Sequence, residues 1–163
     1  MSTFEEIKEE RIKKINTLKN KGINPYPVSS LKDCNIAEVL SGFARLSKKK
    51  QLLSVAGRVM ALRSHGGSIF FDINDGSTNS LHKNPAPIQA YIKKDEAGEE
   101  QFSLFSEIVD VGDFIEVSGR LFLTKKKEKT IKVSRWKMLA KSLRPLPEKW
   151  HGLKDIEERF RKR

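Results

Sequence analysis

The sequence has little cysteine and no long apolar run, and both absences narrow the class of protein. Cys34 is the only cysteine, so no disulfide forms within the chain, and we expect a reducing compartment such as the cytoplasm. No stretch approaches the roughly 18 apolar residues of a membrane-spanning helix, so we expect no membrane partner. The first residues, MSTFEEIKEER, lack the apolar centre of a signal peptide.

Side chains for catalysis or metal binding are missing in the patterns that such chemistry needs. His65, His82 and His151 stand apart, and none has a thiol or carboxylate at metal-ligand spacing. The sequence has no glycine-rich phosphate-binding loop and no nucleophile with a suitable histidine base. We therefore expect no active site, metal or cofactor in this chain.

Positive charge is what the sequence does have. Its 163 residues include 32 Lys and Arg against 21 Asp and Glu, which gives a net charge of +11 and a pI near 9.8. Such an excess attracts polyanions, of which nucleic acid is the commonest in a cell. The alternative is a merely soluble basic protein, and the placement of the charges has to decide between the two.

The N-terminal third is predicted to be helical. Apolar residues recur at helical spacing over residues 4–21, and Gly22 supplies a C-terminal stop. Two prolines within 24–27 then favour an extended link, because the residue before a proline avoids helical angles. A second short helix is expected around 36–43. We assign residues 1–50 to an N-terminal helical extension.

From Leu53 onward the pattern changes to strands. A polar loop is expected over 76–85, a helix over 99–109, and a bend or bulge at Gly57. Three strands, a helix and two further strands is the order of the OB-fold, a small five-stranded barrel that binds oligonucleotides. We place this barrel at residues 51–141. The five strands are expected at roughly 53–62, 68–74, 87–93, 114–123 and 130–138.

Strand alternation separates the inside of this barrel from its outside. It places Phe70, in the second strand, and Gln89, in the third, on the outer face near one another. Single-stranded bases stack on such a ring, and an amide can read a base edge. The expected inward residues are Ile69, Phe71 and Ile73 in the second strand, Ile88, Ala90 and Ile92 in the third, and Ile115, Val117, Leu121 and Leu123 in the fourth.

A basic segment lies beside this face. Residues 124–137 hold seven Lys or Arg and one acid, Glu128, across the turn between the last two strands. An outward phenylalanine is more often covered by a loop, and a charge run is usually only a solvated turn, but here the two features adjoin. We expect Trp136 in the core or at its edge. The candidates for holding an RNA backbone are Arg58, Arg63, Lys125, Lys126 and Lys127.

The C-terminal stretch LRPLPEKWHGLKDIEERFRKR, residues 143–163, resembles a segment of class II lysyl-tRNA synthetases. In that family it joins the anticodon-binding barrel to the catalytic domain, so 142–163 is expected to be a connector. The resemblance covers most of residues 4–163. It is also carried by residues 22–27, 56–60, 70–73 and 111–113.

The resemblance implies roles for three residues on the outer face. Phe70 and Gln89 match the residues that stack on and read the central uridine of the anticodon. Glu128 matches an acid near the barrel rim that helps to read a flanking base. Two departures stand out, because the loop 76–85 is longer than the family's short turn and Lys127 stands where the family commonly has a glycine.

The resemblance further implies that the chain recognises the anticodon stem-loop of tRNA(Lys) for a lysine–tRNA ligase. Lysine attachment, with ATP and Mg²⁺, would take place on a catalytic domain outside these residues, so this chain by itself is not expected to be an enzyme. The family dimerises mainly through that domain, which leads us to expect a homodimeric parent protein and a monomeric piece. The alternatives are a free-standing OB-fold tRNA-binding protein, a non-specific single-strand binder and an interaction-only domain.

Overall fold

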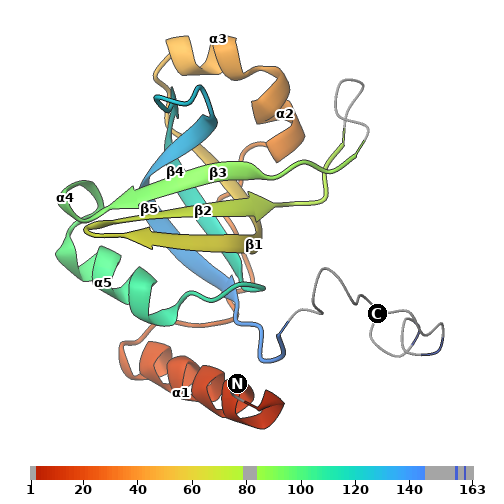
Figure 1. Cartoon of the computed structure of the whole chain (residues 1–163), viewed down its shortest axis with the longest axis vertical. Helices are drawn as coiled ribbons and strands as arrows, with labels where there is room; N and C mark the ends of the chain where they lie inside the picture. Colours follow the sequence, from red (N-terminus) through yellow and green to blue (C-terminus); the bar gives the residue numbers. More distant parts are fainter. Residues whose placement is uncertain (1–2, 79–83, 146–156, 158–159, 161–163) are drawn as a thin grey trace.

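Five strands close into a barrel in the computed structural model, which describes residues 3–78, 84–145, 157 and 160 (Figure 1). Their order around the barrel is β1-β2-β3-β5-β4. Strands β3 and β5 run parallel, and the other neighbours are antiparallel. The expected five-stranded OB-fold barrel is thereby confirmed. The strands are β1 Leu53–His65, β2 Ser68–Asn74, β3 Ile88–Lys93, β4 Phe114–Leu123 and β5 Lys129–Ala140.

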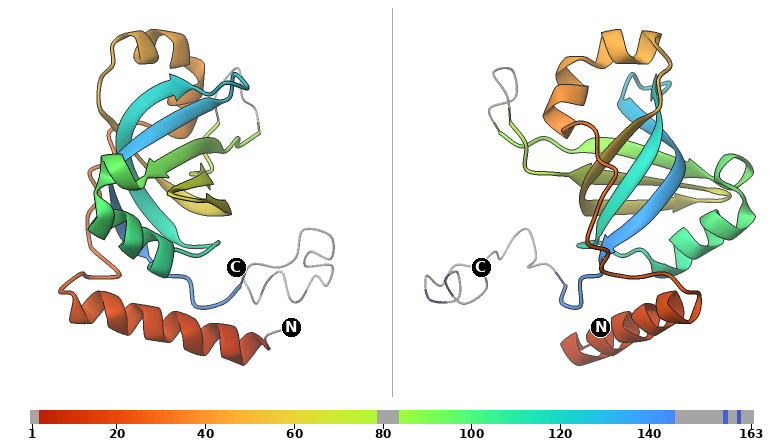
Figure 2. Two further views of the ribbon diagram at one scale, coloured as in Figure 1. Left: turned by 60° about the vertical axis from the view of Figure 1, so that its left-hand side comes forward. Right: turned by 180° about the vertical axis from the view of Figure 1, so that it is seen from behind.

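Helices cover both ends of the barrel. Helix α1 lies at one end and the pair α2 and α3 at the other, as both views in Figure 2 show. α1 starts where Thr3 and Glu6 form a capping box, with Glu6 N donating to Thr3 Oγ1 at 3.3 Å and Thr3 N to the Glu6 carboxylate at 2.7 Å. The helices are α1 Phe4–Asn20, α2 Ile36–Ser41, α3 Phe43–Lys48, α4 Lys94–Ala97 and α5 Glu99–Ile108.

Two helical predictions need correction. The single helix expected around 36–43 is divided at Gly42 into α2 and α3, and the short helix α4 was not predicted. Helix α4 has only four residues, which are too few to show a helical period. None of the helices in the described part of the chain has the length and apolarity to span a membrane.

The barrel interior is filled by the residues that alternation placed there. All the inward residues predicted in β2 and β3 are buried, as are Ile115, Val117 and Leu121 of β4. Helix α5 packs against the barrel, where the rings of Phe105 and Phe71 lie 4.8 Å apart. Trp136 packs edge-on against Phe105 and donates to the carbonyl of Gln101, which confirms its predicted place at the edge of the core.

Two predictions about the strands are wrong. Leu123 is 56% exposed, because it pairs with Lys129 at the last position of the β4–β5 hairpin, beyond the filled interior. The bulge of β1 lies between Val59 and Ala61 rather than at Gly57. Gly57 instead allows a close approach of two strands, since a Cβ there would stand 2.8 Å from the carbonyl oxygen of Asn74.

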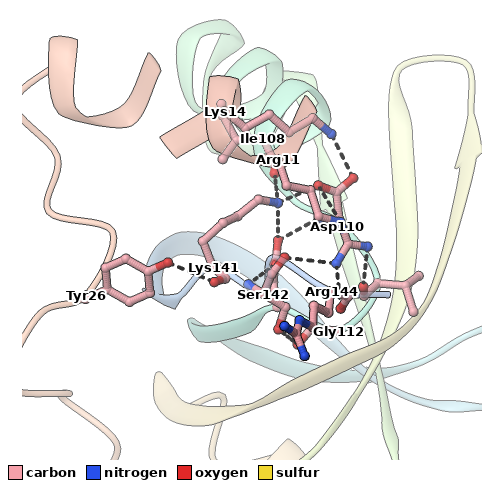
Figure 3. Close-up of polar contacts among 11 residues, drawn as sticks. Arg11, Lys14, Tyr26, Ile108, Asp110, Gly112, Lys141, Ser142 and Arg144 are labelled. Atoms are coloured by element: carbon pink, nitrogen blue, oxygen red, sulfur yellow. Dashed lines mark hydrogen bonds and ion pairs between the residues drawn. The ribbon is translucent and has the colours of Figure 1, made fainter. Parts of the chain in front are cut away.

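A buried polar junction, formed by Arg11, Lys14, Asp110, Asp113 and Lys141, ties the chain together at the end of the barrel near α1 (Figure 3). Lys141 Nζ is fully buried, pairs with Asp110 and Asp113, and donates to the carbonyl of Ile108. The Arg11 guanidinium donates to the carbonyls of Val111, Ser142 and Arg144. The junction therefore fixes α1 and the chain leaving β5 to the segment between α5 and β4.

Candidate nucleic-acid interface

An open cavity of about 910 Å³ lies on the outer face of the barrel, between α2, strands β1 to β3 and the β4–β5 turn. We call it the outer-face cavity. It brings together most of the residues that the sequence singled out, although they come from β1, β2, β3 and the β4–β5 turn. Its lining is Leu40, Arg63, Phe70, Asp72, Pro87, Gln89, Thr124, Lys125, Lys126, Glu128 and Lys129.

Phe70 supplies an aromatic wall. It is half-buried on β2, directly opposite Tyr91 on β3, and the two ring centroids lie 4.6 Å apart at an interplanar angle of 37°. Tyr91 in turn meets Phe122 of β4 at 6.2 Å, so an aromatic row crosses the outer face. Tyr91 was not among the predicted site residues, although its outward position in β3 was a signal that could have identified it.

Gln89 is held in one orientation. Thr130 Oγ1 donates to its Oε1 at 2.9 Å, and its Nε2 donates to a Glu128 carboxylate oxygen at 3.2 Å. Thr130 is fully buried, so the first partner is fixed by packing. An amide oxygen accepts two hydrogen bonds and an amide nitrogen donates two, so each atom keeps room for one more partner. Gln89 therefore presents an acceptor and a donor side by side.

The β4–β5 turn positions Glu128. Its backbone N–H donates to Thr124 Oγ1 at 3.1 Å, and the turn closes through Lys127 N, which donates to the carbonyl of Thr124 at 2.8 Å. Lys127 adopts φ +62°, in the left-handed region where glycine carries the least strain. A glycine, which the resemblance led us to expect here, would adopt this conformation with less strain. Lys127 itself does not line the outer-face cavity, whereas Lys125 and Lys126 do.

Arg63 of β1 also lines the outer-face cavity. Its two terminal nitrogens donate to the two oxygens of Asp72 at 2.9 and 3.1 Å. This hydrogen-bonded pair raises the pKa of Arg63 above its ordinary value, so the guanidinium stays charged. The arginine side chain is 52% exposed, which leaves the cation facing the cavity and solvent.

The structure leaves other predicted residues away from this cavity. Arg58 stacks over the ring of Phe114 at 4.6 Å and does not line it. In the long loop 76–85, residues 79–83 lie outside the described part of the chain, and so does most of the connector 142–163. Among the described residues, no group of three or more His, Cys, Asp or Glu side chains could hold a metal ion.

Comparison with known proteins gives two results. Residues 53–139 match the family described as the OB-fold nucleic acid binding domain, of the tRNA anti-codon type. The chain is also 42% identical over 164 residues to a lysine–tRNA ligase of Thermotoga maritima, an alignment that covers 98% of this chain and 31% of that protein. It is 43% identical over 162 residues to a lysine–tRNA ligase of Thermosipho melanesiensis, covering 97% and 31%.

A third lysine–tRNA ligase, from Methanoculleus marisnigri, is 40% identical over 155 residues, with 94% of this chain and 29% of that protein covered. The chain thus spans about a third of the length of the curated relatives it matches. The matched family region coincides with the five strands that enclose the barrel and carry the outer-face cavity. The chain belongs to the family of OB-fold nucleic acid binding domains.

Proposed function

We propose that the outer-face cavity binds the anticodon of a lysine tRNA, as the recognition part of a lysyl-tRNA synthetase. The observation that carries this proposal is the pairing of Phe70 with an oriented Gln89 in an open cavity edged by lysines. The names of the relatives, all lysine–tRNA ligases, support the choice of RNA.

Phe70 is the proposed stacking residue. An anticodon base that leaves its own stack loses contact with its neighbours, and a protein ring replaces that contact. Tyr91, at 4.6 Å behind Phe70, holds the ring in place. Stacking of this kind contributes about 1–3 kcal/mol per base.

Gln89 is the proposed reading residue, with Glu128 and Thr130 setting its orientation. The edge of uracil offers an N–H donor beside a carbonyl acceptor, which suits the acceptor and donor that Gln89 presents. Cytosine offers the opposite order at that edge. Turning the amide over to suit cytosine would place Oε1 against the Glu128 carboxylate, so that two acceptors face each other. The orientation of the Gln89 amide therefore favours a uridine over a cytidine at this position.

Lysines and an arginine are the proposed backbone contacts. Lys125, Lys126 and Arg63 edge the outer-face cavity, and Lys127 belongs to the same turn. Neutralising phosphates releases condensed counterions, so binding weakens as salt increases. We do not assign Arg58 to this group, since its guanidinium stacks on Phe114.

Anticodon binding is one part of the activity that we propose for the parent protein. We propose that residues 1–50, 51–141 and 142–163 are respectively a helical extension, the anticodon-binding barrel and a connector. Lysine attachment, with its ATP and Mg²⁺, would occur on residues outside this chain, in a cytoplasmic homodimer. The relatives are about three times longer than the chain, which leaves room for such a catalytic domain.

The proposal is tested by titrating the chain with a tRNA(Lys) anticodon stem-loop and with a stem-loop of equal length whose loop is scrambled. We expect tighter binding of the lysine stem-loop at every salt concentration, and weaker binding of both RNAs as salt increases. Equal affinity for both would favour a non-specific single-strand binder. An absence of salt-dependent binding would favour an interaction-only domain.

A further inference from the structure

A second cavity, of about 430 Å³, lies between helices α2 and α3 and the β4–β5 hairpin. Its apolar lining residues are Leu40, Phe43, Ala44 and Leu123, and its two cations are Lys48 and Lys129. Leu40 and Lys129 also line the outer-face cavity, so the two cavities meet along a shared wall. An RNA strand that leaves the outer-face cavity along this wall therefore enters the second cavity.

Leu123 gives this second cavity an open apolar side. It is 56% exposed at the end of β4, whereas Phe43 at the base of the cavity is only 4% exposed. An apolar surface bordered by ammonium groups suits a nucleotide, whose base is flat and largely apolar on its faces and whose phosphate is an anion.

Lys129 stands where the two cavities join. Its Nζ donates to the carbonyl of Leu40 at 2.9 Å and lies 5.7 Å from the centre of the Phe43 ring. An ammonium group has three N–H donors, so Lys129 retains capacity to bind an anion while it holds α2. If the anticodon triplet occupied the outer-face cavity and the adjoining base occupied the second cavity, the phosphate that joins those two nucleotides would pass this point.

We propose that the second cavity binds the base of the nucleotide adjoining the anticodon triplet in the same RNA strand. This inference rests on the proposed function, since it extends that RNA-binding site by one nucleotide. Two observations favour an RNA base over an apolar peptide: the wall shared with the outer-face cavity, and the cations of Lys48 and Lys129 at the edge.

The test uses tRNA(Lys) anticodon stem-loops that carry 2-aminopurine at one or the other position next to the triplet. Its fluorescence reports whether that base changes its stacking on binding. We expect a change at one of the two positions with the natural chain. Leu123→Ala should abolish that change and weaken binding about fivefold, the lower end of the stacking range. Ala44→Glu, at an exposed position that lines only the second cavity, should do the same by filling it and repelling phosphate.

Leu52→Ala is the matched control, because Leu52 is 51% exposed and lines neither cavity. It should leave both the fluorescence change and the affinity intact. The inference is overturned if neither position responds, if the response survives in Leu123→Ala and Ala44→Glu, or if Leu52→Ala abolishes it equally. Preference for the lysine triplet, measured in the same titrations, separates the two proposals. If that preference persists without a response beside the triplet, only the second cavity is misassigned.

Discussion

The buried polar junction and the outer-face cavity use the same kinds of side chain under different conditions. In the junction, Lys141 is fully buried and meets two carboxylates, so its charge is matched within the protein. In the outer-face cavity, Lys125 and Lys126 are exposed at the edge of an open groove. A matched, buried charge holds the fold together, whereas a cation left in solvent can meet an anion from outside. The two regions should therefore respond to mutation in opposite ways.

Lys141→Met is expected to have the largest effect, and the effect is on stability. The variant leaves the buried carboxylate of Asp113 without its cation, and breaking a buried pair costs about 3–5 kcal/mol. Urea unfolding measures the free energy of unfolding. Lys132→Met is the control on the same strand, since its ion pair with Glu96 is exposed and contributes about 0–1 kcal/mol. Similar losses in the two variants would contradict the comparison.

A smaller effect is expected from Asp110→Asn, and it should depend on pH. Burial raises the pKa of Asp110, but hydrogen bonds from Lys14 and Lys141 outweigh it and hold the pKa below the ordinary 3.8. The stability contributed by the ionised carboxylate is therefore complete above pH 3.8 and is lost as pH falls through the lower value of the folded protein. The difference in unfolding free energy between the natural chain and Asp110→Asn should narrow on acidification below pH 3.8.

Asp95→Asn is the control for that pH profile. The pKa of Asp95 is also lowered, by its hydrogen bond with Lys93, but its side chain is 71% exposed and solvent screens the pair. We expect a small difference from the natural chain at every pH. A constant difference for Asp110→Asn across the same range would mean that the junction does not depend on that charge.

Phe70→Ala should do the opposite of Lys141→Met: it should weaken RNA binding and leave the free energy of unfolding nearly unchanged. Loss of one stacked base should weaken anticodon stem-loop binding by about 1–3 kcal/mol, while the fold is retained because Phe70 lies on the outer face. Isothermal titration and urea unfolding measure the two quantities on the same sample. Phe70→Tyr keeps the ring and should keep the affinity. Unchanged affinity in a folded Phe70→Ala variant would remove Phe70 from the interface.

Lys125→Ala should give the smallest loss of RNA affinity, and the loss should be the same for every stem-loop sequence. A lost phosphate contact weakens cognate and altered stem-loops by similar factors and lowers the slope of log affinity against log salt by about 0.7 for a single strand. The unfolding free energy should stay within about 0.5 kcal/mol, as for most surface substitutions. Lys19→Ala, at an exposed position of α1 at the other end of the barrel, should change neither quantity. A selective loss for one base would make Lys125 a reading residue.

The two regions also differ in how far the sequence predicted them. Strand alternation is a local pattern of period two. It therefore located β2 and β4 correctly and predicted that Phe70 and Gln89 lie on the outer face. The junction brings together residues from positions 11, 110 and 141, and no local pattern records such distant pairings. Leu123 was misplaced for a related reason, because alternation does not tell where the filled interior ends.

Within the outer-face cavity, the residues themselves were easier to predict than the hydrogen bonds between them. Phe70, Gln89 and Glu128 were each named from sequence, but the contact between Gln89 and Glu128 depends on the turn geometry at Lys127. Tyr91 was not predicted, because it belongs to an aromatic row across neighbouring strands that the alternation of a single strand does not reveal. The sequence also did not show that the Arg58 side chain lies over the ring of Phe114.

The central claim is that an oriented Gln89 reads one base of a lysine anticodon. The most direct measurement is the affinity of the natural chain and of Gln89→Ala for tRNA(Lys) anticodon stem-loops in which each triplet base is changed in turn. We expect one uridine-to-cytosine change to weaken binding to the natural chain by about 1–3 kcal/mol, and Gln89→Ala to lose this discrimination while the other base changes keep their effects. Equal weakening of every stem-loop by Gln89→Ala, with the discrimination intact, would contradict it.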